Sequence, residues 1–249
     1  MKIPFYRILT ILFFSVFAIS PFHHFAISPS QWTRVDSLLN LGQPRSALEI
    51  VDKIYSAAKA ENNDEQVVKA IIYRIKINAT FQENAMERAI REVKTEIGLS
   101  SQPRSQILHS ILGELYQMYY QQNQYRFRDR SHVASNLADS VESWDLTTLF
   151  RSATRHYLLA LANPDQLKSI PIQRFTDILQ VDFYEVKQKD EKIAQAAQPT
   201  LYDFLAMRAI DFFTSDERPD ILPVKSFEIR SRWMFDITSG FIRNRMFIP

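Results

Sequence analysis

The sequence predicts a mainly all-α fold, built as TPR-like helical hairpins or an irregular α-solenoid with a short β-like C-terminal tail. Apolar residues recur at spacings of three and four along most of residues 31–214, which is typical of amphipathic helices. Short breaks rich in Pro, Asn, Asp or Gly separate these segments. Only 4 of the 249 residues are Gly, which is few for the tight turns of a β-sandwich or barrel.

The first part of the body is predicted to contain three consecutive helices. Residues 31–41 place Val35, Leu38 and Leu39 on one face, and Gly42 opens the turn that follows. The second helix begins at Pro44, because proline suits the first helical position. It ends before a polar break, from which Asn63 or Asp64 caps a third helix over residues 65–81.

Two further helices are predicted up to residue 124. Residues 85–97 form the first, and we expect Gly98 to end it in the left-handed backbone conformation. Residues 106–124 form a long helix with a predicted core side of Ile107, Ile111, Leu112, Leu115, Met118 and Tyr119. Residues 125–141 are polar and are expected to be irregular.

The remaining helices are predicted at residues 144–161, with Asp145 or Ser143 as the cap, and at residues 200–214. After Pro219 the apolar residues alternate in the manner of a strand.

The sequence suggests four parts: a leader at 1–26, TPR-like hairpins at 27–130, a second helical part at 131–218 and a strand-like tail at 219–249. The run Leu112-Gly113-Glu114-Leu115-Tyr116 has the small-residue pattern that lets paired helices approach closely. An irregular helical bundle fits the same pattern, and both alternatives are all-α.

The leader has the features of a secretory signal. Lys2 and Arg7 precede the apolar run 8–17, which is shorter than the roughly 20 residues that span a bilayer. Cleavage after Ser20 or after Ala26 is compatible with the small residues there. An uncleaved anchor is the alternative, and it would be the chain's contact with a membrane. In both cases we expect the body to be exported, to the periplasm, the cell envelope or the exterior.

Composition excludes several kinds of chemistry. The chain has no Cys, so it cannot form disulfides, Cys-ligated zinc sites, iron–sulfur clusters or a Cys nucleophile. It contains no Gly-rich phosphate-binding loop. Beyond the leader the basic and acidic residues balance, which argues against nucleic acid as a partner.

No catalytic, metal-binding or cofactor-binding residue is predicted, and we expect a protein that is not an enzyme. None of the 5 histidines lies at a metal-ligand helical spacing. His109 and His156 fall within predicted helices, where a packed or surface role is expected. His156 could act with Asp145 or Glu142 only if tertiary folding joined them, and a cryptic enzyme of that kind ranks last among the hypotheses.

An aromatic and arginine-rich cluster near residues 116–130 is the most suggestive feature for binding. Its candidate interaction residues are Tyr119, Tyr120, Tyr125, Arg126, Arg128 and Arg130. A base-stacking surface is disfavoured for an exported protein. A protein-contact surface is the functional interpretation, and a helical core that ends in an arginine-rich loop is the structural one.

Several segments together resemble the N-terminal region of large bacterial α2-macroglobulin family proteins of the Bacteroidetes type. They are residues 32–55, 68–75, 107–127, 144–161 with its Arg155-His156-Tyr157, and 199–213. Residues 227–247 are similar to the start of the β-rich region that follows in that family.

The resemblance implies an exported helical module of a protein in the endopeptidase-inhibitor family. Its partners would be proteases or envelope proteins. The bait region and thioester of that family have no counterpart here, so no thioester residue is transferred and a truncated chain is expected. The alternative is a free-standing TPR-like adaptor of the envelope.

Overall fold

The structure is a computed structural model, and helices dominate the residues that it describes. It describes residues 27–128, 140–175, 178 and 199–215. No β-strand occurs within those ranges, which confirms the mainly α-helical prediction. The predicted leader at 1–26 and the strand-like tail at 219–249 lie outside them.

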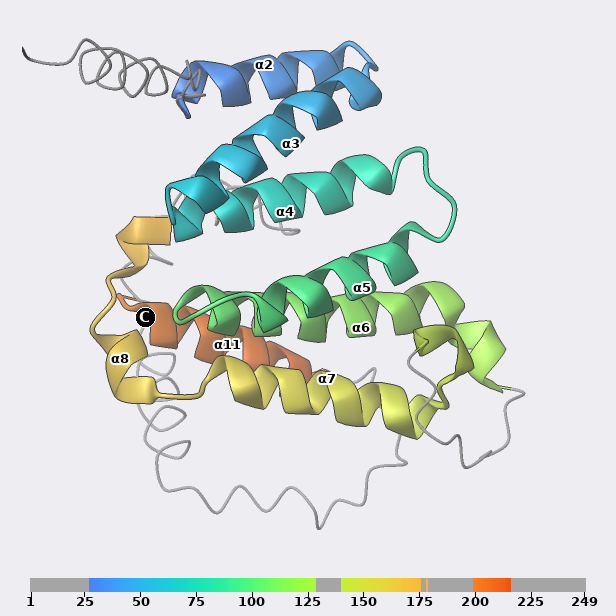
Figure 1. Cartoon of the computed structure of the whole chain (residues 1–249). Coiled ribbons are helices and arrows are strands. Elements are labelled where there is room, and N and C mark those ends of the chain that lie inside the picture. The colour runs from blue at the N-terminus through green and yellow to red at the C-terminus, as the bar shows by residue number, and fades with distance from the viewer. Residues whose placement is uncertain (1–26, 129–139, 176–177, 179–198, 216–249) are drawn as a thin grey trace, which may run out of the picture. The chain divides into compact units, whose positions relative to one another are not determined.

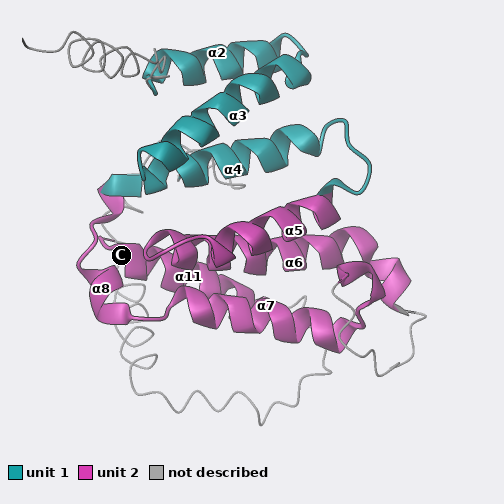
Figure 2. Cartoon of the chain, in the orientation of Figure 1, with its two compact units in different colours: residues 1–85, 174–187 teal, residues 86–173, 188–249 magenta. Residues whose placement is uncertain are grey.

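The chain divides into two compact units (Figure 2). Unit 1 comprises Met1–Ala85 and Arg174–Lys187, and unit 2 comprises Met86–Gln173 and Gln188–Pro249. The sequence instead suggests a division after residue 130, where the composition becomes polar. That point falls inside unit 2, because helices on either side of it pack against each other.

Unit 1 contains α2 (Pro29–Asn40), α3 (Pro44–Ala60) and α4 (Asp64–Asn78), which follow one another as antiparallel neighbours (Figure 1). Gly42 joins α2 to α3 at a φ of 68°, a conformation that glycine adopts without strain. Pro44 occupies the first turn of α3, as predicted. Of the two predicted caps for α4, Asn63 is the one observed, since its side chain accepts from the backbone N–H of Gln66.

A buried cluster in unit 1 combines Trp32 with aliphatic side chains. Its buried members come from all three helices: Trp32, Val35, Ala47, Val51, Ile54, Ala70 and Ile77. The Nε1 of Trp32 donates to Oε1 of Gln66 at 2.8 Å, so the buried indole keeps a hydrogen bond. The hydroxyl of Tyr73 donates to Asp36 at 2.9 Å. These two bonds join α2 to α4.

Unit 2 contains α5 (Ala85–Gly98), η1 (Val141–Ser143), α8 (Pro164–Lys168) and the three helices that form its centre. Those three are α6 (Arg104–Arg128), α7 (Leu146–Ala160) and α11 (Leu201–Thr214). A short η2 (Ile172–Phe175) follows α8. Figure 1 shows α6 and α7 lying along each other, and α11 packs against both.

A close approach of α6 and α7 occurs at Gly113. A Cβ built on Gly113 would lie 2.8 Å from two ring carbons of Tyr157, closer than real Cβ contacts. The Tyr157 ring in turn stacks on Phe212 of α11, with ring centroids 4.7 Å apart. The expected role of a small residue at this point is therefore confirmed.

Two local predictions about helix ends in unit 2 were wrong. Gly98 lies within α5 without a positive φ, because the N–H groups of Leu99 and Ser100 bond to Glu96 and Ile97 and close the helix with a tight turn. The segment after residue 124 is also not irregular at its start, since α6 runs on to Arg128 after a non-helical Asn123.

Side-chain caps fix the starts of α7 and α11. Asp145, one of the two predicted caps of α7, accepts from the N–H of Thr148 at 2.7 Å. Thr200 begins α11 with a capping box, in which its side chain accepts from the N–H of Asp203 and the Asp203 carboxylate accepts from the N–H of Thr200.

Candidate functional site

The predicted tyrosine and arginine cluster does not form one surface. Tyr119 is only 1% exposed and packs edge-on against Phe127, with centroids 6.3 Å apart. Tyr120 is half-buried, and its ring lies edge-on to Phe150 of α7, with centroids 5.0 Å apart. The prediction of Tyr119 as a contact residue was therefore wrong, because its side of α6 faces the core of unit 2.

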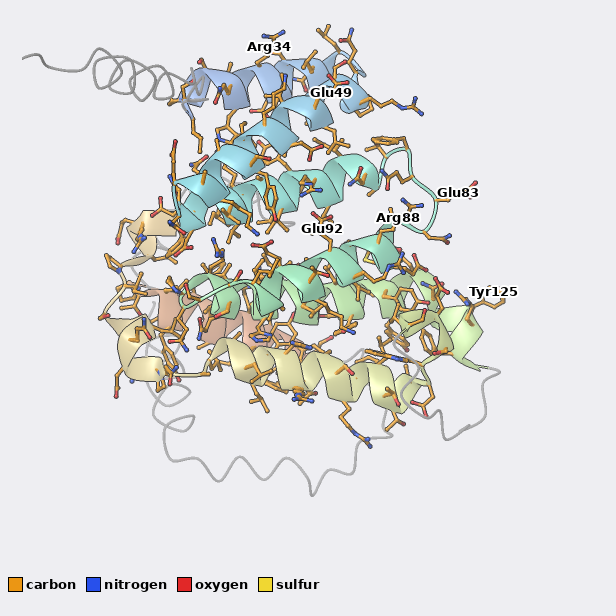
Figure 3. All side chains as sticks on the ribbon, viewed as in Figure 1. Arg34, Glu49, Glu83, Arg88, Glu92 and Tyr125 are labelled. Atoms are coloured by element: carbon orange, nitrogen blue, oxygen red, sulfur yellow. The ribbon has the colours of Figure 1, made fainter. Side chains whose placement is uncertain are left out.

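The exposed part of the cluster is smaller. Tyr125 is 70% exposed and projects from the C-terminal end of α6 (Figure 3). Arg126 is exposed and donates to Oδ1 of Asn123 at 3.2 Å. Arg128 ends α6, and Arg130, like the side chain of Arg128, lies outside the described residues. Tyr125 and Arg126 therefore remain as candidates for contact with a partner.

Two histidines that are distant in the sequence meet between α6 and α7. The Nδ1 atoms of His109 and His156 are 2.8 Å apart, and the ring centroids are 5.0 Å apart. The ring of Tyr116 lies 5.8 Å from that of His156. The sequence placed both histidines in helices but contained no signal that would pair them.

The carboxylates that the sequence suggested for His156 are not its observed partner. Asp145 caps the N-terminus of α7, and His156 lies eleven residues further along the same helix. That separation corresponds to about 16 Å along the helix axis, too far for a hydrogen bond. The observed hydrogen-bonding partner of His156 is the other imidazole. Among the described residues, no carboxylate is seen to orient either imidazole as the acid of a nucleophile–base–acid triad does.

Burial and positive charge keep this histidine pair neutral at neutral pH. Burial, together with charge repulsion from His109, Arg155 and Lys94, lowers the pKa of His156 to about 4. Burial also lowers the pKa of His109, with Arg155 adding to the effect. One neutral ring then donates its Nδ1–H to the Nδ1 of the other.

A metal is not indicated at the pair or elsewhere within the described ranges. No group of three or more His, Asp or Glu side chains there could hold an ion. Zinc sites in proteins use three or four side chains. The cationic surroundings of the pair also oppose a bound cation.

A buried ion pair joins α6 to α11. Arg208 forms a salt bridge with Glu114, and both side chains are largely buried. The Nε of Arg208 donates to Ser110 Oγ at 2.8 Å. This contact was not predicted from the sequence, where its signal was the presence of polar Ser110 and Glu114 within the apolar face of a predicted core helix. Arg208 and Glu114 neutralise each other's buried charge, which indicates a structural role for this ion pair.

A groove lies between α2 and α3 in unit 1. Its volume is about 450 Å³, and it is lined by Gln31, Arg34, Leu38, Gln43, Ser46, Glu49, Ile50 and Lys53. Figure 3 labels Arg34 on α2 and Glu49 on α3, the two helices that form it. Arg34, Glu49 and Lys53 are exposed, and within the described part of the chain none of them forms an ion pair. The groove therefore offers charges of both signs over a partly apolar floor.

Comparisons with protein-family models, with curated proteins and with solved structures gave no match to this chain. Within the ranges that the structure describes, no helix has the length and apolar character needed to cross a membrane.

Proposed function

We propose that the chain is an exported, non-catalytic helical scaffold that binds protein partners, as the N-terminal module of an α2-macroglobulin-like protein. The resemblance of its ordered segments to that family supports the second part. The helical architecture of both units is compatible with it. The TPR-like description of the hairpins, with α2, α3 and α4 as successive antiparallel helices, belongs to the same proposal.

The groove of unit 1 is the observation on which the binding role rests. It combines Leu38 and Ile50, both partly exposed, with three charged side chains that have no ion-pair partner among the described residues. An apolar centre with a polar rim is typical of protein interfaces. The volume of about 450 Å³ is near the lower end of the roughly 300–1,000 Å³ found for ligand pockets, enough for one or two anchoring side chains.

Export is proposed from the leader, and the partner class follows from it. A body outside the cytoplasm would meet proteases and envelope proteins. A free-standing TPR-like adaptor of the envelope would use the same groove. The two versions differ in the DNA that follows the codon for Pro249, where macroglobulin-like domains would exclude the free-standing adaptor.

Capture of partners by groove variants tests the binding role. The full chain, immobilised, is exposed to envelope extract of the organism that makes it, and bound proteins are identified by mass spectrometry. Ser46→Trp fills the groove from α3. Ser56→Trp is a matched control, because Ser56 is exposed on the same helix outside the groove.

We expect Ser46→Trp to lose envelope proteins or proteases that the unaltered chain and Ser56→Trp both retain. Equal capture by all three forms would show that the groove does not bind them. Recovery of neither a protease nor an envelope protein by the unaltered chain would contradict the proposal as a whole.

A further inference from the structure

The histidine pair occupies a sensitive position in unit 2. His109 lies on α6 and His156 on α7, and their Nδ1 atoms are 2.8 Å apart. Only one proton fits between two nitrogen atoms at that distance, so one ring must donate and the other must accept. The contact therefore requires at least one neutral imidazole, and a second proton at Nδ1 would remove the acceptor.

The charged groups that act on the pair from the neighbouring helices are cationic. Arg155 acts from α7 and Lys94 from α5. On α11, Arg208 also carries a positive charge, but Glu114 of α6 neutralises it in a buried salt bridge. From α6 itself, Tyr116 presents an aromatic ring, and burial keeps its hydroxyl neutral by raising its pKa to about 12. None of the groups that shift the pair is a carboxylate that would stabilise an imidazolium.

The pair is continuous with the aromatic core of unit 2. The Tyr116 ring lies 5.8 Å from His156 and 5.3 Å from Trp144. Tyr157, the residue after His156, stacks on Phe212 of α11. Separation of the two histidines would therefore move the residues that hold α6, α7 and α11 together.

We propose that His109 and His156 form an acid-released latch between α6 and α7, closed when they share one proton and opened when both are protonated. In the opened state two imidazolium groups face each other beside Lys94 and Arg155, without an acceptor between them. Repulsion in a partly desolvated site then separates the helices and exposes the aromatic core of unit 2. This device is independent of the groove and of the partners proposed for it.

The direction of the pH dependence follows from the lowered pKa values. Unfolded histidine has a pKa of about 6.5, so between about pH 6.5 and about pH 4 the closed state binds fewer protons than the open state. The latch contributes its full stability above about pH 6.5, and the contribution falls as the pH drops toward about 4. For each proton taken up on opening, the equilibrium constant for opening rises by at most about tenfold for every unit by which the pH falls.

The first test reads the two imidazoles directly in the full chain. Long-range ¹H–¹⁵N NMR spectra between pH 7.5 and pH 4 report the protonation of each ring. We expect His156 to remain neutral at pH 6, where an isolated histidine is mostly charged, and His109 to titrate below its ordinary pKa. Titration of either ring near pH 6.5 as an ordinary histidine would overturn the proposal.

The second test separates the latch from general acid unfolding. The double variant His109→Asn/His156→Asn keeps a short polar pair that does not titrate between pH 4 and pH 7. Near-UV circular dichroism, which reports aromatic packing, should be lost at a higher pH in the unaltered chain than in this variant. His132→Asn, which replaces a histidine that is not part of the pair, serves as the control and should behave as the unaltered chain.

Two results would contradict the latch. Loss of the near-UV signal at the same pH with and without the histidines would show that other groups cause it. An increase of the urea midpoint on addition of Zn²⁺ or Cu²⁺, lost in the double variant, would assign the pair to metal binding instead. If the double variant fails to fold, the NMR titration of the unaltered chain and the single variant His109→Asn decide the question.

Discussion

Gly113→Ala adds one methyl group at the point where α6 lies closest to α7. The new Cβ would be 2.8 Å from two ring carbons of Tyr157 and 3.2 Å from a third. The ring cannot turn away freely, because it is buried and stacks on Phe212 at 4.7 Å. The substitution must therefore shift a helix or disturb the aromatic stack.

Two opposing effects set the size of the change in the free energy of unfolding. Inserting a methyl group into a packed core costs about 1–3 kcal/mol. Replacing glycine by alanine within a helix gains about 1 kcal/mol. With a middle value for the first effect, Gly113→Ala should destabilise unit 2 by about 1 kcal/mol.

Gly98→Ala is the matched control for this prediction. It makes the same chemical change at a helical glycine of unit 2, but its Cβ would meet no atom within 4 Å. It should stabilise the protein by about 0.5 kcal/mol through helix propensity alone. The two alanine variants should therefore differ in sign.

Urea unfolding followed by circular dichroism measures both variants. With an m-value of about 2 kcal/mol per molar urea, Gly113→Ala should lower the midpoint of the unit 2 transition by about 0.5 M. Gly98→Ala should raise it slightly. If Gly113→Ala raised the midpoint as Gly98→Ala does, the close approach of α6 to Tyr157 would be refuted.

Three other pairs of variants test the described contacts. Glu114→Ala should cost about 3 kcal/mol by removing the carboxylate that neutralises the buried Arg208 charge, and Glu114→Leu combined with Arg208→Met should recover most of that loss in the same urea assay. Tyr119→Ala should lower stability by about 3 kcal/mol, whereas Tyr125→Ala should change it by less than about 0.5 kcal/mol; equal effects in thermal unfolding would contradict their assigned burial. Asp145→Ala should cost about 1 kcal/mol through loss of the α7 cap, and Asp145→Asn, which retains an acceptor, should cost less.

Helices and several of their ends could be predicted from the sequence because those features are local. Pro44 and the two cap residues Asn63 and Asp145 act within one helical turn of their own position. Gly98 shows where such reasoning fails. A glycine after a helix favours the left-handed conformation, but the backbone bonds that follow Gly98 close the helix without it.

The candidate sites were harder to predict, since each depends on which helices become neighbours. Tyr119 and Tyr125 look alike in the sequence, yet Tyr119 is buried in unit 2 and Tyr125 projects into solvent. His109 and His156 are separated by 47 positions, and only the pairing of α6 with α7 joins them. The same holds for Arg208 and Glu114.

The sequence by itself determined the all-α class, the turn at Gly42 and the absence of cysteine chemistry. These properties follow from composition and from interactions over a few residues, which any fold of this chain must respect. Tertiary structure alone decided the division into units at Ala85, the partly buried histidine pair and the Arg208–Glu114 ion pair. Those features depend on the rotation of each helix about its axis, which long-range packing sets and local propensity does not.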